Sequence, residues 1–285
     1  MDPDALRLYG PLVLGLASAT AFDQLTRTRG LEPPGFRNPW RRLLATTVVA
    51  GIFFLMFFAG LGQIGLPEPP VRELSRVDLF SFHEILVVAL IAWYLLGFAG
   101  KLPAGRSLGG EATRQLGFVS ARPLREVGLG LALGVLAWPA LIVTILLVAG
   151  ALVALGNQGL LDATPPPLIV QLAALPVGWK LAIALSAGVV EEAFFRGLLQ
   201  PRVGIAISSL LFVLAHLSYD QPFMLVGITL LSLFFAGLVW WRQNLWPAIA
   251  AHFLFDAVQL LFLIPWALEQ WSAGGKTIGP VLLPW

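Results

Sequence analysis

Three short patterns of titratable residues follow one another in the second half of the chain. The first is the run Glu191–Arg196, in which two adjacent glutamates precede an arginine. The second ends at His216, four residues after Phe212, and the third places His252 four residues before Asp256. Carboxylates and imidazoles activate water and transfer protons near neutral pH. The three patterns therefore indicate acid–base chemistry, provided that the elements carrying them meet.

The elements that carry these residues are apolar segments of membrane-spanning length. The chain is 58% hydrophobic and 12% charged, whereas a soluble globular chain contains about 25% charged residues. An ionised carboxylate at the centre of a spanning helix costs about 2.5–3.5 kcal/mol on the insertion scale, so intramembrane carboxylates indicate a functional site. We predict an all-α polytopic membrane protein, a bundle of about eight transmembrane helices, or seven if the first is interfacial. The candidate segments are about 8–25, 43–66, 82–100, 127–155, 180–199, 204–218, 222–241 and 246–265.

The basic residues predict how the bundle is oriented. Cytoplasmic loops retain lysine and arginine, and 13 of the 18 basic residues fall on one face of the predicted topology. This places the loops at 67–78 and 156–179 and both termini outside the cytoplasm. We therefore predict a multi-pass protein of the inner or plasma membrane of a prokaryotic cell. The 13 residues are Arg27, Arg29, Arg37, Arg41, Arg42, Lys101, Arg106, Arg114, Arg122, Arg125, Arg196, Arg202 and Arg242.

Helical spacing predicts different surroundings for the two adjacent glutamates. Glu192 lies four residues before Arg196, the favourable order for an ion pair on one helix face. Glu191 is rotated by about 100° on an α-helix, so it lacks that partner and faces other helices. The small residues Ser186, Ala187 and Gly188 on the preceding turn allow a neighbouring backbone to approach closely.

One further histidine precedes these patterns. His83, followed by Glu84, stands at the predicted start of the third span, near other polar residues. We interpret this pair as capping or interfacial.

Composition narrows the remaining classes of protein. The chain has no cysteine, which excludes disulfides, thiolate metal sites and a cysteine nucleophile. The formal charge of +2 arises from loop residues and not from a basic patch, so no nucleic-acid partner is expected. We divide the chain into N-terminal helices and cytoplasmic loops (1–126) and a second part (127–285) that contains the three patterns.

In this order and spacing, the patterns Glu-Glu-x-x-x-Arg, Phe-x-x-x-His and His-x-x-x-Asp resemble the CAAX protease and bacteriocin-processing family of intramembrane endopeptidases. The resemblance covers about residues 180–260 and implies a conical intramembrane active-site cavity. It implies Glu191 as the general base, His216 as its assistant, and His252 with Asp256 at the developing charge. Glu192, Arg196 and Phe212 would support these residues. The substrate would be a membrane-associated protein or peptide: a lipid-modified protein, a peptide leader or a sorting tail.

Asp256 departs from the pattern of the prenyl-protein members, which usually have asparagine there. Asparagine can donate a hydrogen bond to an oxyanion, whereas an ionised aspartate cannot. Three roles remain for Asp256: a protonated donor, an orienting partner of His252, or a cation ligand. We favour the orienting role.

Neither the cofactor nor the class of function follows from the patterns alone. If Glu191 activates the water, the reaction requires no cofactor. Alternatively, a divalent metal such as zinc could be bound by Glu191, His216, His252 and Asp256. The closed His-Glu-x-x-His spacing of soluble zinc proteases is absent. Two alternatives to a protease are a proton-coupled transporter, since such residues also form proton relays, and a non-catalytic immunity or scaffold member of the same family.

Overall fold

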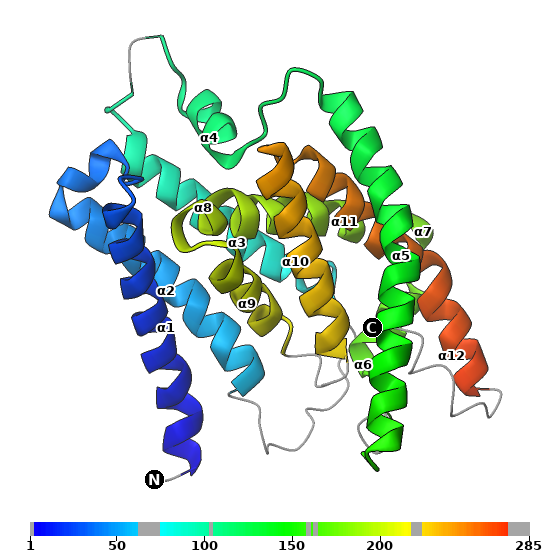
Figure 1. Ribbon diagram of the computed structural model, residues 1–285. Helices are drawn as coiled ribbons and strands as arrows, with labels where there is room; N and C mark the ends of the chain where they lie inside the picture. The colour runs from blue at the N-terminus through cyan, green and yellow to red at the C-terminus, as the bar shows by residue number, and fades with distance from the viewer. Residues whose placement is uncertain are drawn as a thin grey trace.

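The computed structural model describes residues 3–61, 75–102, 105–157, 161, 165–217 and 224–272 (Figure 1). These residues form helices and their connections, which confirms the all-α prediction. In chain order the helical elements are α1 (Pro3–Thr28), η1 (Pro34–Arg37), α2 (Pro39–Leu61), α3 (Arg76–Phe98), α4 (Leu108–Leu116), α5 (Pro123–Ala154), α6 (Pro167–Ala174), α7 (Val177–Ser186), η3 (Ala187–Leu199), α8 (Gln200–Val203), α9 (Ile205–Ala215), α10 (Met224–Arg242), α11 (Trp246–Val258), η5 (Gln259–Leu263) and α12 (Ile264–Ser272).

The predicted spans coincide with these helices, and the protein is a multi-pass membrane protein. Within the described residues, five helices are long and apolar enough to cross a membrane: α2, α3, α5, α10 and the continuous helix from α11 to α12. The other three predicted spans coincide with α1, with the helix from α7 to α8, and with the shorter α9. Residues 67–74 of the predicted loop at 67–78 lie outside the described residues, and the loop ends earlier than predicted because α3 begins at Arg76. The predicted loop at 156–179 contains the short helix α6 and the start of α7. The division at 126/127 falls in the first turn of α5.

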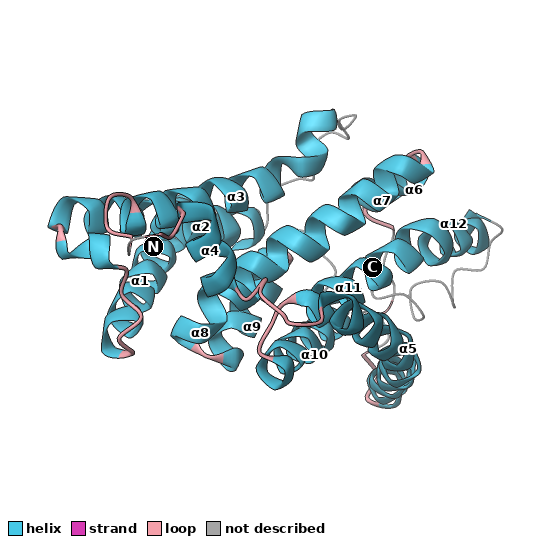
Figure 2. Cartoon of the chain, turned by 90° about the horizontal axis from the view of Figure 1, so that it is seen from above, coloured by secondary structure: helices cyan, strands magenta, loops and turns pink. Residues whose placement is uncertain are grey.

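Glycines set the closest contacts between helices. A Cβ atom at Gly130 of α5 would lie 2.2 Å from the carbonyl oxygen of Pro247 on α11. A Cβ atom at Gly15 of α1 would lie 2.8 Å from the backbone nitrogen of Phe54 on α2. Small residues at such points let two backbones pack without intervening side chains. They bring α5 against α11, and α1 against α2, at opposite sides of the bundle (Figure 2).

One end of the bundle carries the basic residues and a set of arginine–carboxylate pairs. Glu111 on α4 accepts hydrogen bonds from Arg106 and Arg114, and Glu126 on α5 pairs with Arg242 at the end of α10, with Oε1–Nη2 and Oε2–Nε distances of 2.6 and 2.9 Å. Hydrogen bonding from the Arg114 guanidinium lowers the pKa of the Glu111 carboxyl to about 2. The pair of Glu126 and Arg242 ties α5 to α10, whereas the pairs of Glu111 lie within α4 and the segment before it, and both sets lie at the end shown uppermost in Figure 1.

Arg196 is an exception to the predicted set of basic loop residues. Its side chain is only 1% exposed, inside the bundle. The assignment of Arg196 to the basic face is therefore wrong. Arg202 on α8 is also buried, but α8 itself lies at the basic end, where Arg29 contacts the carbonyl oxygen of Pro201.

Candidate active site

The two glutamates lie on η3, whose 13 residues form a π-helix and not the α-helix expected from the sequence. π-helical turns are rare and are found frequently at functional sites. On the preceding turn, a Cβ atom at Gly188 would lie 3.0 Å from the carbonyl oxygen of Ile249 on α11. The predicted close approach at this turn is confirmed, and it brings α11 and its histidine against η3.

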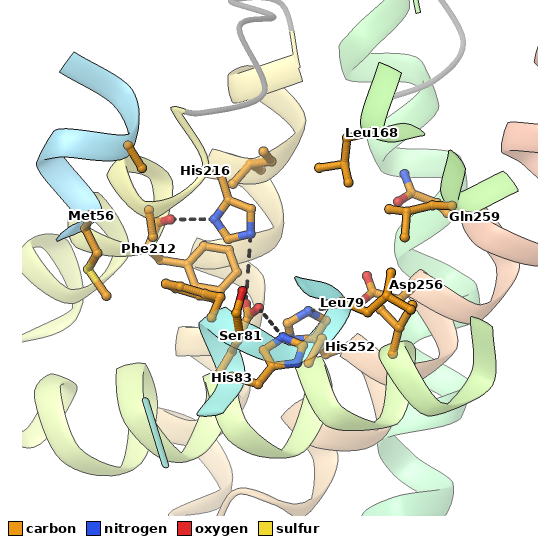
Figure 3. A pocket seen from close by; sticks show the side chains of 18 of the residues that line it. Met56, Leu79, Ser81, His83, Leu168, Phe212, His216, His252, Asp256 and Gln259 are labelled. Atoms are coloured by element: carbon orange, nitrogen blue, oxygen red, sulfur yellow. Dashed lines mark hydrogen bonds and ion pairs between the residues drawn. The ribbon is translucent and has the colours of Figure 1, made fainter. Parts of the chain in front are cut away.

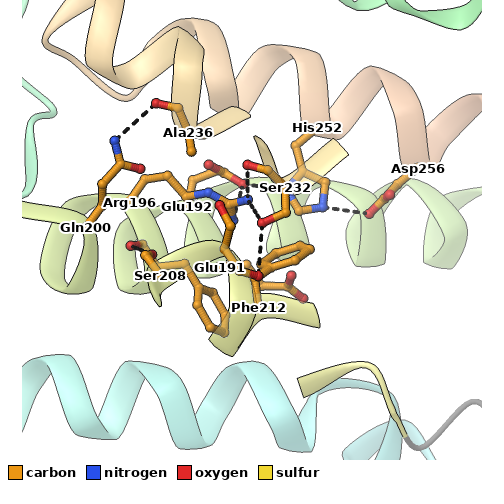
Figure 4. A network of polar contacts seen from close by, with 12 residues as sticks. Glu191, Glu192, Arg196, Gln200, Ser208, Phe212, Ser232, Ala236, His252 and Asp256 are labelled. Carbon is orange, nitrogen blue, oxygen red and sulfur yellow. Dashed lines mark hydrogen bonds and ion pairs between the residues drawn. The ribbon is translucent and has the colours of Figure 1, made fainter. Parts of the chain in front are cut away.

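Glu192 and Arg196 form the predicted ion pair, with Oε1 and Nη1 3.1 Å apart. Both side chains are buried. Arg196 also donates through Nη2 to the hydroxyl and the carbonyl oxygen of Ser232 on α10, each at 3.1 Å (Figure 4). A buried arginine with a carboxylate partner and two backbone or hydroxyl acceptors holds η3 to α10, and removal of either charge would leave the other uncompensated.

Glu191 faces two histidines on other helices, as its predicted orientation requires. Its Oε1 lies 3.2 Å from Nε2 of His83 on α3, and its Oε2 lies 3.9 Å from Nε2 of His216 at the end of α9. His216 places its other ring nitrogen, Nδ1, 2.7 Å from the carbonyl oxygen of Phe212. Since a carbonyl oxygen only accepts, Nδ1 carries the proton and, in the neutral ring, Nε2 is left as an acceptor towards Glu191.

The interpretation of His83 as a capping or interfacial residue is wrong. α3 begins at Arg76 and is capped by Ser75 with Asp78, so His83 lies two turns inside the helix and is buried. Its Nδ1 is buried and has no hydrogen-bond partner among the described residues. Sequence reasoning missed this residue because the apolar run begins late, at about residue 82. The early capping pair Ser75 and Asp78 was the signal that could have placed it in the membrane interior.

His252 on α11 lies between two carboxylates. Its Nδ1 is 2.9 Å from Glu192 Oε1, and its Nε2 is 3.5 Å from Asp256 Oδ2. The contact with Asp256 confirms that this pair shares a helix face. The shorter contact with Glu192 was not predicted. It means that Glu192 holds both Arg196 and His252.

Aromatic rings separate and hold these groups. The guanidinium carbon of Arg196 lies 4.2 Å from the ring centre of Phe212, and Phe212 also contacts His216, with ring centres 4.6 Å apart. Phe235 of α10 stacks on His252 at 4.8 Å and 15°. Phe212 thus supports an arginine on η3 and a histidine on its own helix, in agreement with its predicted supporting position.

A cavity of about 520 Å³ brings the candidate residues together. His83, Glu191, His216, His252 and Asp256 all line it, and most other lining side chains are apolar (Figure 3). The volume lies within the range of about 300–1,000 Å³ typical of ligand pockets. An apolar chamber with a few convergent titratable groups suits an apolar substrate with a polar reacting bond.

The four residues that were considered as zinc ligands do not direct their donor atoms at one common position. Both ring nitrogens of His252 are directed at carboxylates, and Nδ1 of His216 is directed at a carbonyl oxygen. In the described part of the chain, no group of three His, Asp or Glu side chains is placed to hold one ion. The side chains as placed do not fit a three-ligand zinc site.

Comparison with known proteins bears on the same segment. Residues 173–258, from α6 to the end of α11, match the family model of the Rce1-like type II CAAX prenyl endopeptidases. The uncharacterized protein YpbD of Bacillus subtilis (strain 168) is 37% identical over 78 residues, which are 27% of this chain and 41% of YpbD. The chain therefore spans about two fifths of the length of that relative. No solved structure matches the chain.

The match confirms the resemblance that the three motifs indicated. It includes Glu191, Glu192, Arg196, His216 and His252. The family whose model this segment matches is a family of proteases, so the similarity points to hydrolysis as the general class of activity.

Proposed function

We propose that the protein is an intramembrane endopeptidase that hydrolyses a peptide bond of a membrane-associated protein or peptide. The observation that carries the proposal is the position of Glu191. Its buried carboxylate faces a cavity and two imidazoles. In the part of the chain that the structure describes, no arginine pairs with it as Arg196 pairs with Glu192. A carboxylate in such surroundings can accept a proton and release it again.

The distances at Glu191 suit the activation of water. Glu191 Oε2 and His216 Nε2 are 3.9 Å apart, a separation that one water molecule spans with two hydrogen bonds of about 2.8 Å. The water oxygen attacks the carbonyl carbon of the substrate while Glu191 takes its proton. The carbon–nitrogen bond then breaks as that proton passes to the leaving nitrogen. His216 acts as an acceptor that orients the water.

His252 is placed to stabilise the negative charge that develops on the carbonyl oxygen. With a carboxylate at each ring nitrogen, the imidazole carries a proton on both nitrogens and presents positive charge to the cavity. Preorganised charge of this kind usually contributes more than any other effect to the stabilisation of such a transition state. Asp256 and Glu192 are orienting partners of this imidazole, and no metal takes part in these steps.

The test compares the wild-type protein with Glu191→Gln in lipid nanodiscs. A pool of membrane peptides is incubated with each, and new peptide termini are read by mass spectrometry. Glutamine retains the shape of glutamate but cannot accept the proton, so cleavage should fall by about 10²–10⁴-fold, the usual contribution of a general base. Thermal unfolding followed by tryptophan fluorescence should be nearly unchanged. Glu84→Gln, an exposed neighbour of His83 on the same helix, is the matched control and should cleave as the wild type does.

Three outcomes would contradict the proposal. Retention of more than about a tenth of the cleavage in Glu191→Gln would remove the general-base role. If the wild type forms no new termini but dissipates a proton gradient across liposomes in a Glu191-dependent manner, the transporter alternative holds. If it does neither, the non-catalytic alternative holds.

A further inference from the structure

The cavity runs from the middle of the bundle towards one end. α2 contributes residues in its second half, from Ile52 to Ala59, and α3 contributes residues at its start, from Asp78 to Ile85. α10 contributes residues from its first, Met224, to Phe235 near its middle. Because α2 runs towards this end of the bundle and α3 and α10 run away from it, these contributions lie between the middle of the bundle and the same end. The cavity therefore extends from Glu191 to this end of the helices.

The basic residues mark the opposite end. Twelve of the 18 basic residues lie at or just after the ends of α1 and α3, at or just before the starts of α2 and α5, or on η1, α4, α8 and the end of α10. Contacts between these segments show that they form one end of the molecule: Arg29 donates to the carbonyl oxygen of Pro201 at 3.2 Å and Arg41 to that of Ala99 at 3.0 Å. Apart from the buried Arg196, the basic residues outside this group are Arg7, Arg72, Arg76, Lys180 and Lys276.

These two observations fix the side from which the cavity is reached. Segments rich in lysine and arginine stay in the cytoplasm during membrane insertion. The end with Arg29, Arg41 and Arg242 is then cytoplasmic, and the end that the cavity reaches is not. We infer that the active-site cavity opens to the extracytoplasmic side, and that the substrate is an extended apolar stretch of a membrane-anchored polypeptide entering from that side. This inference rests on the proposed endopeptidase function.

The depth of the site defines how much of the substrate must enter. His83, which contacts Glu191, lies seven residues from the start of α3 at Arg76, which is about 10 Å at 1.5 Å per residue. An extended peptide advances about 3.3 Å per residue. About three extended residues therefore separate the scissile bond from the end of the bundle. The lining of these positions is largely apolar, so apolar side chains are favoured there and a folded segment is excluded.

The absence of native cysteine allows a direct test of the orientation. Single cysteines are introduced by Ser81→Cys at the cavity and Thr28→Cys at the end of α1. The two positions are matched: both hydroxyls are exposed and donate to a carbonyl three residues earlier, Asp78 and Leu25 respectively. Intact cells are treated with a membrane-impermeant sulfonated maleimide. Ser81→Cys should be labelled and Thr28→Cys should not, whereas both should be labelled after detergent lysis.

Every other labelling pattern overturns the inference. Labelling of Thr28→Cys alone in intact cells inverts the orientation, and equal labelling of both variants shows that the chain inserts in two orientations. If neither is labelled until lysis, the cavity does not open to the outside. None of these results depends on proteolysis, so they leave the proposed function untouched.

A second measurement tests from which side of the membrane the substrates are cleaved. Membrane proteins from cells that contain the wild type or Glu191→Gln are compared for new termini. Cleavage positions should cluster within about three residues of the extracytoplasmic ends of predicted spans, because that is the depth of the site. Clustering at cytoplasmic ends would overturn the inferred side. A complete absence of differences between the strains would instead count against the endopeptidase function.

Discussion

Two regions of this protein use buried carboxylates in different ways. At the basic end, Glu111 and Glu126 are each held by arginines. At the cavity, Glu191 is held by histidines, His83 and His216. A guanidinium keeps its proton at every pH a protein meets, whereas an imidazole exchanges its proton near neutrality.

The partner of a carboxylate thus indicates what it does. An arginine-paired carboxylate stays ionised and holds local structure, while a histidine-paired carboxylate can take part in proton transfer. Glu192 combines the two cases, since it contacts both Arg196 and His252. It connects the arginine that holds η3 and α10 together to the histidine of the cavity. Substitutions in the two regions should therefore differ in what they impair.

The largest effect is expected at Arg196. Arg196→Ala leaves the buried Glu192 without its cation, and breaking a buried pair typically costs about 3–5 kcal/mol. The free energy of unfolding in nanodiscs should fall by this amount, and the folded yield should fall with it. Arg242→Ala at the basic end is the comparison: this side chain is about a third exposed, so solvent screens its ion pair and the loss should be much smaller. Equal losses for the two variants would show that burial does not distinguish the regions.

Substitution of His83 should lower the rate of turnover and leave folding nearly unchanged. His83→Ala removes the group that holds Glu191 Oε1, so kcat should fall by about 10–100-fold, as is usual for groups that orient a reacting side chain. KM and thermal stability should change little. In His83→Gln the amide nitrogen replaces Nε2 as a donor and should restore most of kcat. A positioning role is ruled out if the alanine and glutamine variants lose activity equally, or if the loss of activity follows a loss of folded protein.

A smaller effect is expected at Asp256. Asparagine can still accept from His252 Nε2 or donate to the oxyanion itself, so Asp256→Asn should keep activity within about tenfold of the wild type. Metal chelators should leave activity unchanged. Near-stoichiometric zinc in the purified protein, together with recovery of the variant by added zinc, would instead indicate a metal ligand at this position.

The smallest effect is expected for the pH dependence of stability, through Glu111 at the basic end. The pKa of Glu111 is about 2 in the folded protein, because Arg114 donates to its carboxylate. Its contribution to stability is therefore complete above the unfolded pKa of about 4.5 and is lost as the pH falls from there towards 2. Glu111→Gln should lower the unfolding temperature slightly at pH 7 and remove part of the decrease between about pH 5 and about pH 3. An unchanged acid dependence in the variant would show that Arg114 does not stabilise the ionised form.

Local spacing predicted much of the site. The pairs Glu192–Arg196 and His252–Asp256 are four residues apart, and contacts at this spacing follow from helix geometry. The apolar segments likewise predicted where helices would form. Contacts between helices could not be read in the same way. His83 reaches Glu191 across 108 residues and Glu192 reaches His252 across 60, and such pairs depend on how α3, η3 and α11 pack.

The π-helical geometry of η3 was also beyond local reasoning, because it follows from the packing on either side of it. A π-helical turn joins residue i to residue i+5, one residue more than an α-helical turn. Removal of a single residue between Ala187 and Leu199 could therefore be absorbed by a return to α-helix, with a span still formed. The directions of Glu191 and Glu192 would nevertheless rotate relative to α3 and α11. The number of residues in this segment is thus as much a determinant of the site as the identity of its glutamates.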